Sequence, residues 1–190
     1  MTILRKGDRA VHFAHVPRTG GRAILQAASR SGWCVERSID GNASEVRSHL
    51  FYDEIKIAAS EIPSFALVRD PIDRFISATK FDGRCNSQGE LITFIDVHDL
   101  VPEVAERHFK PQHSFIGPHT VVYKYETQYE ELVRALVVAG IIHWDVAVEH
   151  FNAGAVLYEV DKSSLNQHLG KVRRWYIEDY RRFGYLGTSG

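Results

Sequence analysis

The sequence predicts an α/β fold with a central parallel sheet flanked by helices. Short apolar runs typical of buried strands alternate with segments whose apolar residues recur at helical spacing. Turn-forming glycines or a helix-capping aspartate follow the first two of these runs. Such alternation is typical of parallel strands with helices on the faces of the sheet, and these sheets bind ligands at the carboxyl ends of their strands.

Each strand is expected to lead into a helix. In chain order, we expect a strand over 10–16 and a helix over 21–30, a strand over 64–69 and a helix over 71–79, a strand over 120–125 and a helix over 127–139, and a helical tail over 164–182. The helix after the second strand has the best-defined start, because Asp70 is a favourable N-cap and Pro71 suits the first helical position.

Length and charge limit the classes of protein that fit. The chain has 190 residues, which predicts one domain spanning 1–190 with a core of its own. Its 23 Lys and Arg residues nearly balance 24 Asp and Glu residues, for a formal net charge of −1. This small net charge excludes global attraction to nucleic acid or to an anionic membrane, so an anion site must be built from a few placed groups.

The cysteines and the N-terminal segment predict a reducing compartment. Cys34 and Cys85 match neither a zinc pattern nor a disulfide-rich secreted scaffold. Two free thiols are expected, with a single bridge as the alternative. The first residues, MTILRKGDRA, lack the apolar core of a signal peptide, and no run is apolar and long enough to cross a bilayer. We therefore expect a soluble protein with no membrane span, cytoplasmic by default.

The loop after the first strand, PRTGGRA, has the composition of an anion site. Gly20 and Gly21 permit a tight turn and let an anion approach the backbone at the start of the next helix. Arg18 and Arg22 add cations, and Thr19 adds a hydroxyl donor. The alternative is a plain strand-to-helix turn. The loop is not a Walker A motif, because no Lys-Ser or Lys-Thr pair follows the glycines.

A second anion contact is expected where the second strand ends. Arg69 closes that strand, and Ser77 lies two helical turns further on. A guanidinium and a hydroxyl in these positions could grip a phosphate together. The alternative is that Arg69 pairs with Asp70 or Asp73 and that Ser77 is a small packing residue.

Together, the two loops resemble those of the carbohydrate-type sulfotransferases, which use 3′-phosphoadenosine 5′-phosphosulfate (PAPS) and include the heparan sulfate 2-O-sulfotransferases. That family shows Pro-Lys-Thr-Gly-Gly-Thr-Ser after its first strand and Arg-Asp-Pro-x-x-Arg-x-x-Ser after a later one. This chain has PRTGGRA at 17–23 and RDPIDRFIS at 69–77. Weaker similarities lie in KPQHSFIG at 110–117, VVYKYETQYEEL at 121–132 and WYIEDYRRFGY at 175–185.

The resemblance implies a single α/β domain related to P-loop nucleotide kinases, without their metal chemistry. PAPS would be the cosubstrate and adenosine 3′,5′-bisphosphate the product, with no metal involved. Arg69 and Ser77 would hold the 3′-phosphate. The first loop would hold the 5′-phosphosulfate through Arg18, Thr19, Gly20, Gly21, Arg22 and Ala23, and Arg18 would also act in catalysis.

The first loop departs from the family pattern at three positions. Arg18 stands where the family has lysine; it keeps the charge, but it is bulkier and cannot lose its proton. Arg22 and Ala23 replace the family's Thr-Ser pair, which removes two hydroxyl donors. These departures bear on catalytic efficiency more than on nucleotide binding.

The expected base is a histidine, because an acceptor hydroxyl is a poor nucleophile until its proton is taken. Among the ten histidines, the resemblance implies His49, which lies about twenty residues before Arg69. His113 and the carboxylates Glu45 and Asp53 are the alternatives.

The expected activity is therefore sulfuryl transfer from PAPS to an acceptor hydroxyl by in-line displacement. The family resemblance alone suggests a carbohydrate acceptor. No nucleic acid partner is expected, and the sequence does not indicate an oligomeric state. The rivals are a sulfotransferase-like module that binds nucleotide or glycan without chemistry, and a P-loop phosphotransferase, against which the missing Walker lysine and magnesium ligands argue.

Overall fold

The chain forms two compact units. The structure is a computed structural model and describes residues 2–39, 46–47, 52, 62–98, 108–148 and 158–185. One unit, here called the sheet unit, comprises Met1–Val68 and Ser114–Phe151. The other, the helical unit, comprises Arg69–His113 and Asn152–Gly190. The expectation of a single domain over 1–190 stays a prediction.

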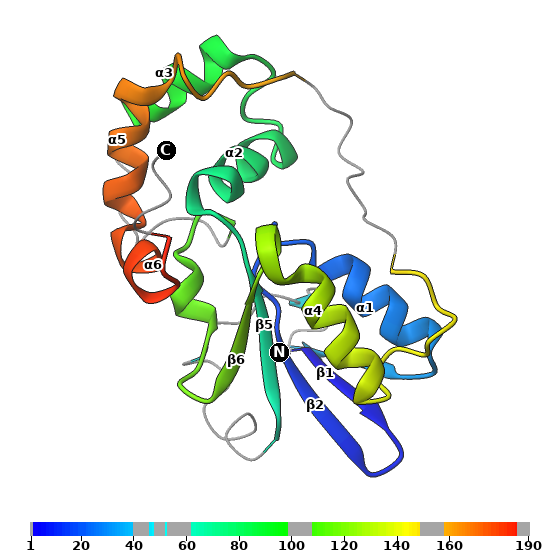
Figure 1. Ribbon diagram of the computed structural model, residues 1–190. Coiled ribbons are helices and arrows are strands. Elements are labelled where there is room, and N and C mark those ends of the chain that lie inside the picture. The colour runs from blue at the N-terminus through cyan, green and yellow to red at the C-terminus, as the bar shows by residue number, and fades with distance from the viewer. Residues whose placement is uncertain are drawn as a thin grey trace. The chain divides into compact units, whose positions relative to one another are not determined.

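The sheet unit is built on one mixed sheet. Its strands, among the described residues, are β1 (Thr2–Lys6), β2 (Arg9–Ala14), β3 (Cys34–Ile39), β4 (Val46–Arg47), β5 (Ser64–Val68) and β6 (Thr120–Lys124). Their order across the sheet is β4-β3-β1-β2-β5-β6. Figure 1 labels four of these neighbours, β1, β2, β5 and β6. The α/β fold class predicted from the sequence is confirmed.

One half of the sheet is parallel, as expected, and the other half is antiparallel. β2 pairs with β5 and β5 pairs with β6 in parallel, with His12, Ser64 and Thr120 in one row across the three strands. The parallel strands therefore end at one edge of the sheet, where ligands bind in this class of fold. β1 adds an antiparallel hairpin to β2, and β3 and β4 extend that half further.

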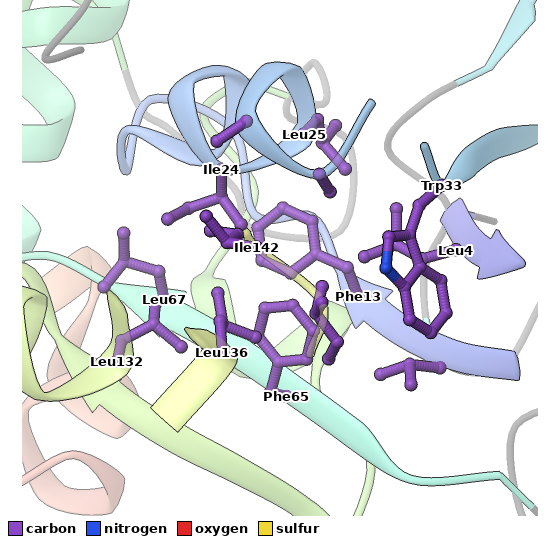
Figure 2. Packing of buried hydrophobic residues seen from close by; sticks show 14 of the residues in the cluster. Leu4, Phe13, Ile24, Leu25, Trp33, Phe65, Leu67, Leu132, Leu136 and Ile142 are labelled. Carbon is purple, nitrogen blue, oxygen red and sulfur yellow. The ribbon is translucent and has the colours of Figure 1, made fainter. Parts of the chain in front are cut away.

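Two helices pack on the sheet over one apolar core. The helix α1 (Gly21–Arg30) follows β2, and α4 (Tyr125–Val138) follows β6. Figure 2 shows their side chains meeting those of the strands. The buried cluster includes Leu4, Phe13, Ile24, Leu25, Phe65, Leu67, Leu132 and Leu136. This burial, at about 25 cal/mol per Å² of apolar surface, is what fixes the ends of β2 and β5 relative to α1.

The helical unit contains helices that surround an aromatic cluster. They are α2 (Pro71–Phe81), α3 (Gln88–Val97), α5 (Asn166–Trp175) and α6 (Ile177–Arg182), and the short 3-10 helix η2 (Gln112–Phe115) begins there. The fully buried ring of Phe75 lies 5.8 Å from that of Phe109 and 5.8 Å from that of Trp175, between ring centroids. In the part of the chain that the structure describes, no helix is both long and apolar enough to traverse a bilayer.

The predicted helical tail over 164–182 is divided into two helices. Tyr176 separates α5 from α6, with φ −110° and ψ 23°. Its ring is buried, and its hydroxyl donates to the backbone oxygen of Phe109 at 2.7 Å. Because this contact joins segments far apart in the sequence, helical periodicity alone gave no sign of the break.

Candidate functional site

The loop between β2 and α1 has an unusual backbone. Gly20 precedes the helix with φ 89°, and Arg18 has φ 66°, the one positive φ of a non-glycine residue among those described. The left-handed conformation disfavours an ordinary side chain, and such strain gathers at functional sites. The predicted tight turn at the glycines is therefore present, and it extends back to Arg18.

Both glycines are also needed for packing. A Cβ added at Gly21 would lie 2.6 Å from Cδ2 of His15 and 2.9 Å from Cε1 of Phe13. A Cβ at Gly20 would lie 3.1 Å from the ring of Tyr125. Distances under 3.0 Å are not found for real Cβ atoms, so Gly21 is where the loop backbone and the side chains beneath it meet most closely.

The start of α1 lacks the groups that usually neutralise a helix N-terminus. No side chain caps the helix, and its first turn contains no acidic residue. Arg18 is half-buried and Arg22 is exposed. The helix dipole and the backbone N–H groups of the first turn make an uncapped helix end attractive to an anion. The uncapped helix start supports an anion site in this loop, and anion binding here stays a prediction.

Two of the predicted donors are used inside the loop. The buried Thr19 hydroxyl donates to the backbone oxygen of Val16 at 3.0 Å, so it would have to rotate to donate to a ligand. The backbone N–H of Ala23 donates to the oxygen of Gly20 at 3.1 Å. Both bonds fix the turn, and the direct contact of Thr19 and Ala23 with nucleotide stays a prediction.

The start of α2, unlike that of α1, is capped by a side chain. The Asp70 carboxylate accepts from the backbone N–H groups of Ile72 and Asp73 at 2.9 and 3.0 Å, which confirms the predicted N-cap. Burial raises the pKa of Asp70, while these hydrogen bonds oppose the shift. The predicted phosphate contacts here are therefore side chains rather than the helix end: Arg69 directly before the cap and Ser77 in the helix, both half-buried.

The backbone of Arg69 is held by a side chain that sequence reasoning missed. The Gln112 side-chain oxygen accepts from the Arg69 N–H at 2.9 Å, and its amide nitrogen donates to the Arg69 carbonyl at 2.8 Å. Gln112 is fully buried. One amide thus satisfies both backbone groups of the residue between β5 and the cap of α2.

Gln112 is held in turn by a buried carboxylate. Asp179 of α6 is fully buried, and its Oδ2 accepts from the Gln112 backbone N–H at 2.8 Å. Its Oδ1 accepts from the His113 backbone N–H at 3.0 Å and lies 2.8 Å from His113 Nδ1. Buried side-chain oxygens require hydrogen-bond donors, and both oxygens of Asp179 have a backbone N–H as donor.

Arg74, which belongs to the RDPIDR segment, is also structural. It is fully buried, with Nη1 donating to the His108 carbonyl at 2.9 Å and Nη2 donating to the Lys110 carbonyl at 2.6 Å. Its guanidinium carbon lies 5.3 Å from the ring centre of Tyr176. A fork of donors suits this task, because one side chain spans two carbonyl groups.

The predicted site residues fall into three groups. Arg18, Thr19, Gly20, Gly21, Arg22 and Ala23 share the loop at the carboxyl end of β2. Arg69 directly follows Val68, the last residue of β5, which is a parallel neighbour of β2. His49, Glu45 and Asp53 lie outside the described residues, so the choice of base stays a prediction; the alternative His113 pairs with Asp179.

Comparison with known proteins adds one finding. The family model described as "Sulfotransferase family" matches residues 2–139, more than half of the 190 residues. The matched range includes both loops and extends through β6 and α4. Searches of curated proteins and of solved structures each return no match.

Proposed function

The chain belongs to the sulfotransferase family, and from this premise we propose that it is a PAPS-dependent enzyme that moves a sulfuryl group to an acceptor hydroxyl. The observation that carries the proposal is the N-terminus of α1, which has no side-chain cap and no acidic residue in its first turn. Arg18 and the glycine turn directly precede it. A sulfuryl donor brings an anion that such a helix end can bind through backbone N–H groups. A cytoplasmic location stays part of the proposal, as the sequence predicts it.

The proposed nucleotide site uses both loops. The β2–α1 loop binds the 5′-phosphosulfate, and Arg69 and Ser77 bind the 3′-phosphate. The proposal is supported by the parallel pairing of β2 and β5, since their carboxyl ends reach the same edge of the sheet. It is also supported by the match of RDPIDRFIS with the family pattern. In the first loop, the proposed contacts come from Arg18, Thr19, Gly20, Gly21, Arg22 and Ala23.

The proposed reaction is an in-line displacement at sulfur. The acceptor oxygen forms a bond to sulfur while the bond from sulfur to the bridging oxygen breaks, and adenosine 3′,5′-bisphosphate leaves. His49 takes the proton of the acceptor hydroxyl. Arg18 stabilises the charge that builds on the bridging oxygen, a form of preorganised electrostatic stabilisation. The left-handed backbone at Arg18 supports this role, because it fixes where the side chain begins.

Nucleotide binding is tested by calorimetry with adenosine 3′,5′-bisphosphate. We expect saturable binding by the wild type and a loss of about ten- to a hundredfold in Arg69→Ala, the range expected when charge-assisted hydrogen bonds are removed. Arg134→Ala, on the exposed face of α4, is the matched control and is expected to bind as the wild type does. No binding by the wild type, or equal binding by Arg69→Ala, would defeat the site assignment.

The chemistry is tested with labelled PAPS and a panel of carbohydrates, lipids and small alcohols. A carbohydrate acceptor is proposed, and His49→Ala is expected to lose turnover while binding adenosine 3′,5′-bisphosphate as before. Binding without transfer to any acceptor would favour a module that has lost its chemistry, the alternative raised by the departures from the family pattern at Arg18, Arg22 and Ala23. Magnesium-dependent ATP turnover without sulfuryl transfer would favour a phosphotransferase.

A further inference from the structure

We propose that Gln112 is a positioning residue that sets the preference for nucleotides carrying a 3′-phosphate. It does so by fixing the backbone of Arg69, and Asp179 anchors it in place. This inference rests on the proposed function, in which Arg69 contacts the 3′-phosphate. It adds two residues to that site which do not touch the nucleotide themselves.

The first step is the contact between Gln112 and Arg69. Arg69 is the one residue between the last residue of β5, Val68, and the N-cap of α2, Asp70. Its N–H and its carbonyl both bind the Gln112 side-chain amide, at 2.9 and 2.8 Å. A side-chain amide that pairs with both groups of one residue acts like a neighbouring strand. It fixes the rotation of the peptide planes on either side of Arg69 and therefore the direction in which the side chain leaves.

The second step is that Gln112 is itself immobile. Its side chain is fully buried and its backbone N–H binds Asp179, which is also fully buried. Gln112 belongs to a segment, residues 108–113, here called the strap. The strap is held at His108 and Lys110 by Arg74, at Phe109 by the Tyr176 hydroxyl, and at Gln112 and His113 by Asp179. Arg74 of α2, Tyr176 between α5 and α6, and Asp179 of α6 thus all bind the strap through buried or half-buried hydrogen bonds.

The third step is energetic. A long arginine side chain loses conformational freedom when it grips a phosphate, and a fixed starting direction reduces that loss. Displacing the start of the side chain by an ångström moves a guanidinium out of bidentate reach of a phosphate. The strap is therefore expected to matter for the part of the affinity that the 3′-phosphate contributes. It is not expected to matter for ligands that lack this group.

The experiment compares two nucleotides on the full chain: adenosine 3′,5′-bisphosphate and adenosine 5′-monophosphate. The ratio of their dissociation constants measures what the 3′-phosphate contributes. Gln112→Met keeps the volume of the side chain but makes neither hydrogen bond to Arg69. We expect at least about tenfold weaker binding of the bisphosphate, with the monophosphate unchanged. Asp179→Asn offers one acceptor oxygen where two are used, and we expect a loss in the same direction.

The matched control is Gln88→Met. Gln88 also joins a distant segment through both ends of its amide, accepting from the Asp161 N–H at 2.8 Å and donating to the Ser164 hydroxyl at 2.6 Å. These two bonds hold residues 161–164 and not the backbone of Arg69. Its ratio should equal that of the wild type. Where Gln112→Met does not fold, Gln112→Glu is used. It keeps the size and the acceptor for the Arg69 N–H but lacks the amide donor, and we expect it too to weaken the bisphosphate selectively.

The outcomes separate this inference from the proposed function. If the wild type does not prefer the bisphosphate, the site assignment fails. If Arg69→Ala abolishes the preference but the Gln112 and Asp179 variants retain it, the assignment stands and the positioning role is overturned. Equal weakening of both nucleotides in the Gln112 variants also overturns it, because that result means a general structural role.

Discussion

Gly21 and His15 pack so closely that no side chain can stand between them. A Cβ at Gly21 would meet the imidazole at 2.6 Å from Cδ2 and 2.8 Å from Nε2, while the His15 ring is stacked on Phe13 at 5.3 Å. The imidazole cannot move aside easily, because Phe13 belongs to the buried core. The glycine turn thus packs, through His15 and Phe13, on the same core that β2 helps to form.

Gly21→Ala is therefore expected to destabilise the protein by about 1–3 kcal/mol, the usual range for an overpacked site. It should also displace the start of α1, so binding of adenosine 3′,5′-bisphosphate should weaken beyond what the loss of stability explains. Thermal unfolding and calorimetry measure the two effects.

Gly170→Ala serves as the control for Gly21→Ala. Gly170 lies in α5, and a Cβ there would meet no atom within 4 Å. Alanine is the better helix former by about 0.5–1 kcal/mol, so this variant should be as stable as the wild type or more so. A Gly21→Ala variant as stable as Gly170→Ala would contradict the packing described for the loop.

Replacing Arg74 by a residue that cannot donate to two carbonyl groups at once is expected to destabilise the protein. Lysine keeps the charge but cannot span the carbonyls of His108 and Lys110 together. Arg74→Lys should therefore cost about 2 kcal/mol, since one buried carbonyl loses its partner. Urea unfolding measures the change, and Arg174→Lys, on the exposed side of α5, should stay within about 0.5 kcal/mol of the wild type. Equal midpoints for the two variants would show that the strap is not held as described.

The features that the sequence predicted are those set by neighbouring residues. The start of α2 was predicted to the residue, because an N-cap and a proline at the first helical position act within one turn. Two other elements also have local signals, although they were not predicted: the β1–β2 hairpin and α3. Gly7 and Asp8 mark the turn of the β1–β2 hairpin, and Ser87 with Glu90 has the spacing of the N-cap bond that starts α3.

The features that the sequence did not predict depend on distant residues. Asp179 sits in a helical pattern of aromatic residues, and nothing nearby indicates that it accepts hydrogen bonds from residues 112 and 113. Gln112 likewise reads as an ordinary polar residue until its partner Arg69, 43 positions away, is placed beside it. Long-range polar contacts of this kind leave no periodicity, so only the fold reveals them.

The two thiols should differ in reactivity. Cys34 is exposed and Cys85 is buried, and both are free, as expected from the sequence. Burial raises the pKa of Cys85, which lowers its thiolate fraction further. One thiol per chain should react rapidly with a disulfide reagent under native conditions, and the second only after unfolding. Cys34→Ser should abolish the rapid phase, and a rapid phase that survives this substitution would contradict the burial of Cys85.

The stability of the sheet should fall on acidification because of one histidine. His12 is 2% exposed, and its Nδ1 is joined to the Ser64 hydroxyl at 2.8 Å, which is joined to the Thr120 hydroxyl at 3.0 Å. Burial lowers the pKa of His12 from 6.5 to about 4. Between these values the unfolded chain binds a proton that the folded chain does not, so the stability rises with pH across this window. The stability that depends on a neutral His12 is fully present above pH 6.5 and is lost as the pH falls towards 4.

The loss between pH 7 and pH 4 from this residue amounts to roughly 3 kcal/mol, at 1.36 kcal/mol per unit of pKa. His12→Asn keeps a side chain that can bond to Ser64 but does not titrate, so its urea midpoint should depend less steeply on pH than that of the wild type. Equal slopes for wild type and His12→Asn would contradict the lowered pKa of His12, because the folded chain would then bind this proton over the same pH range as the unfolded chain.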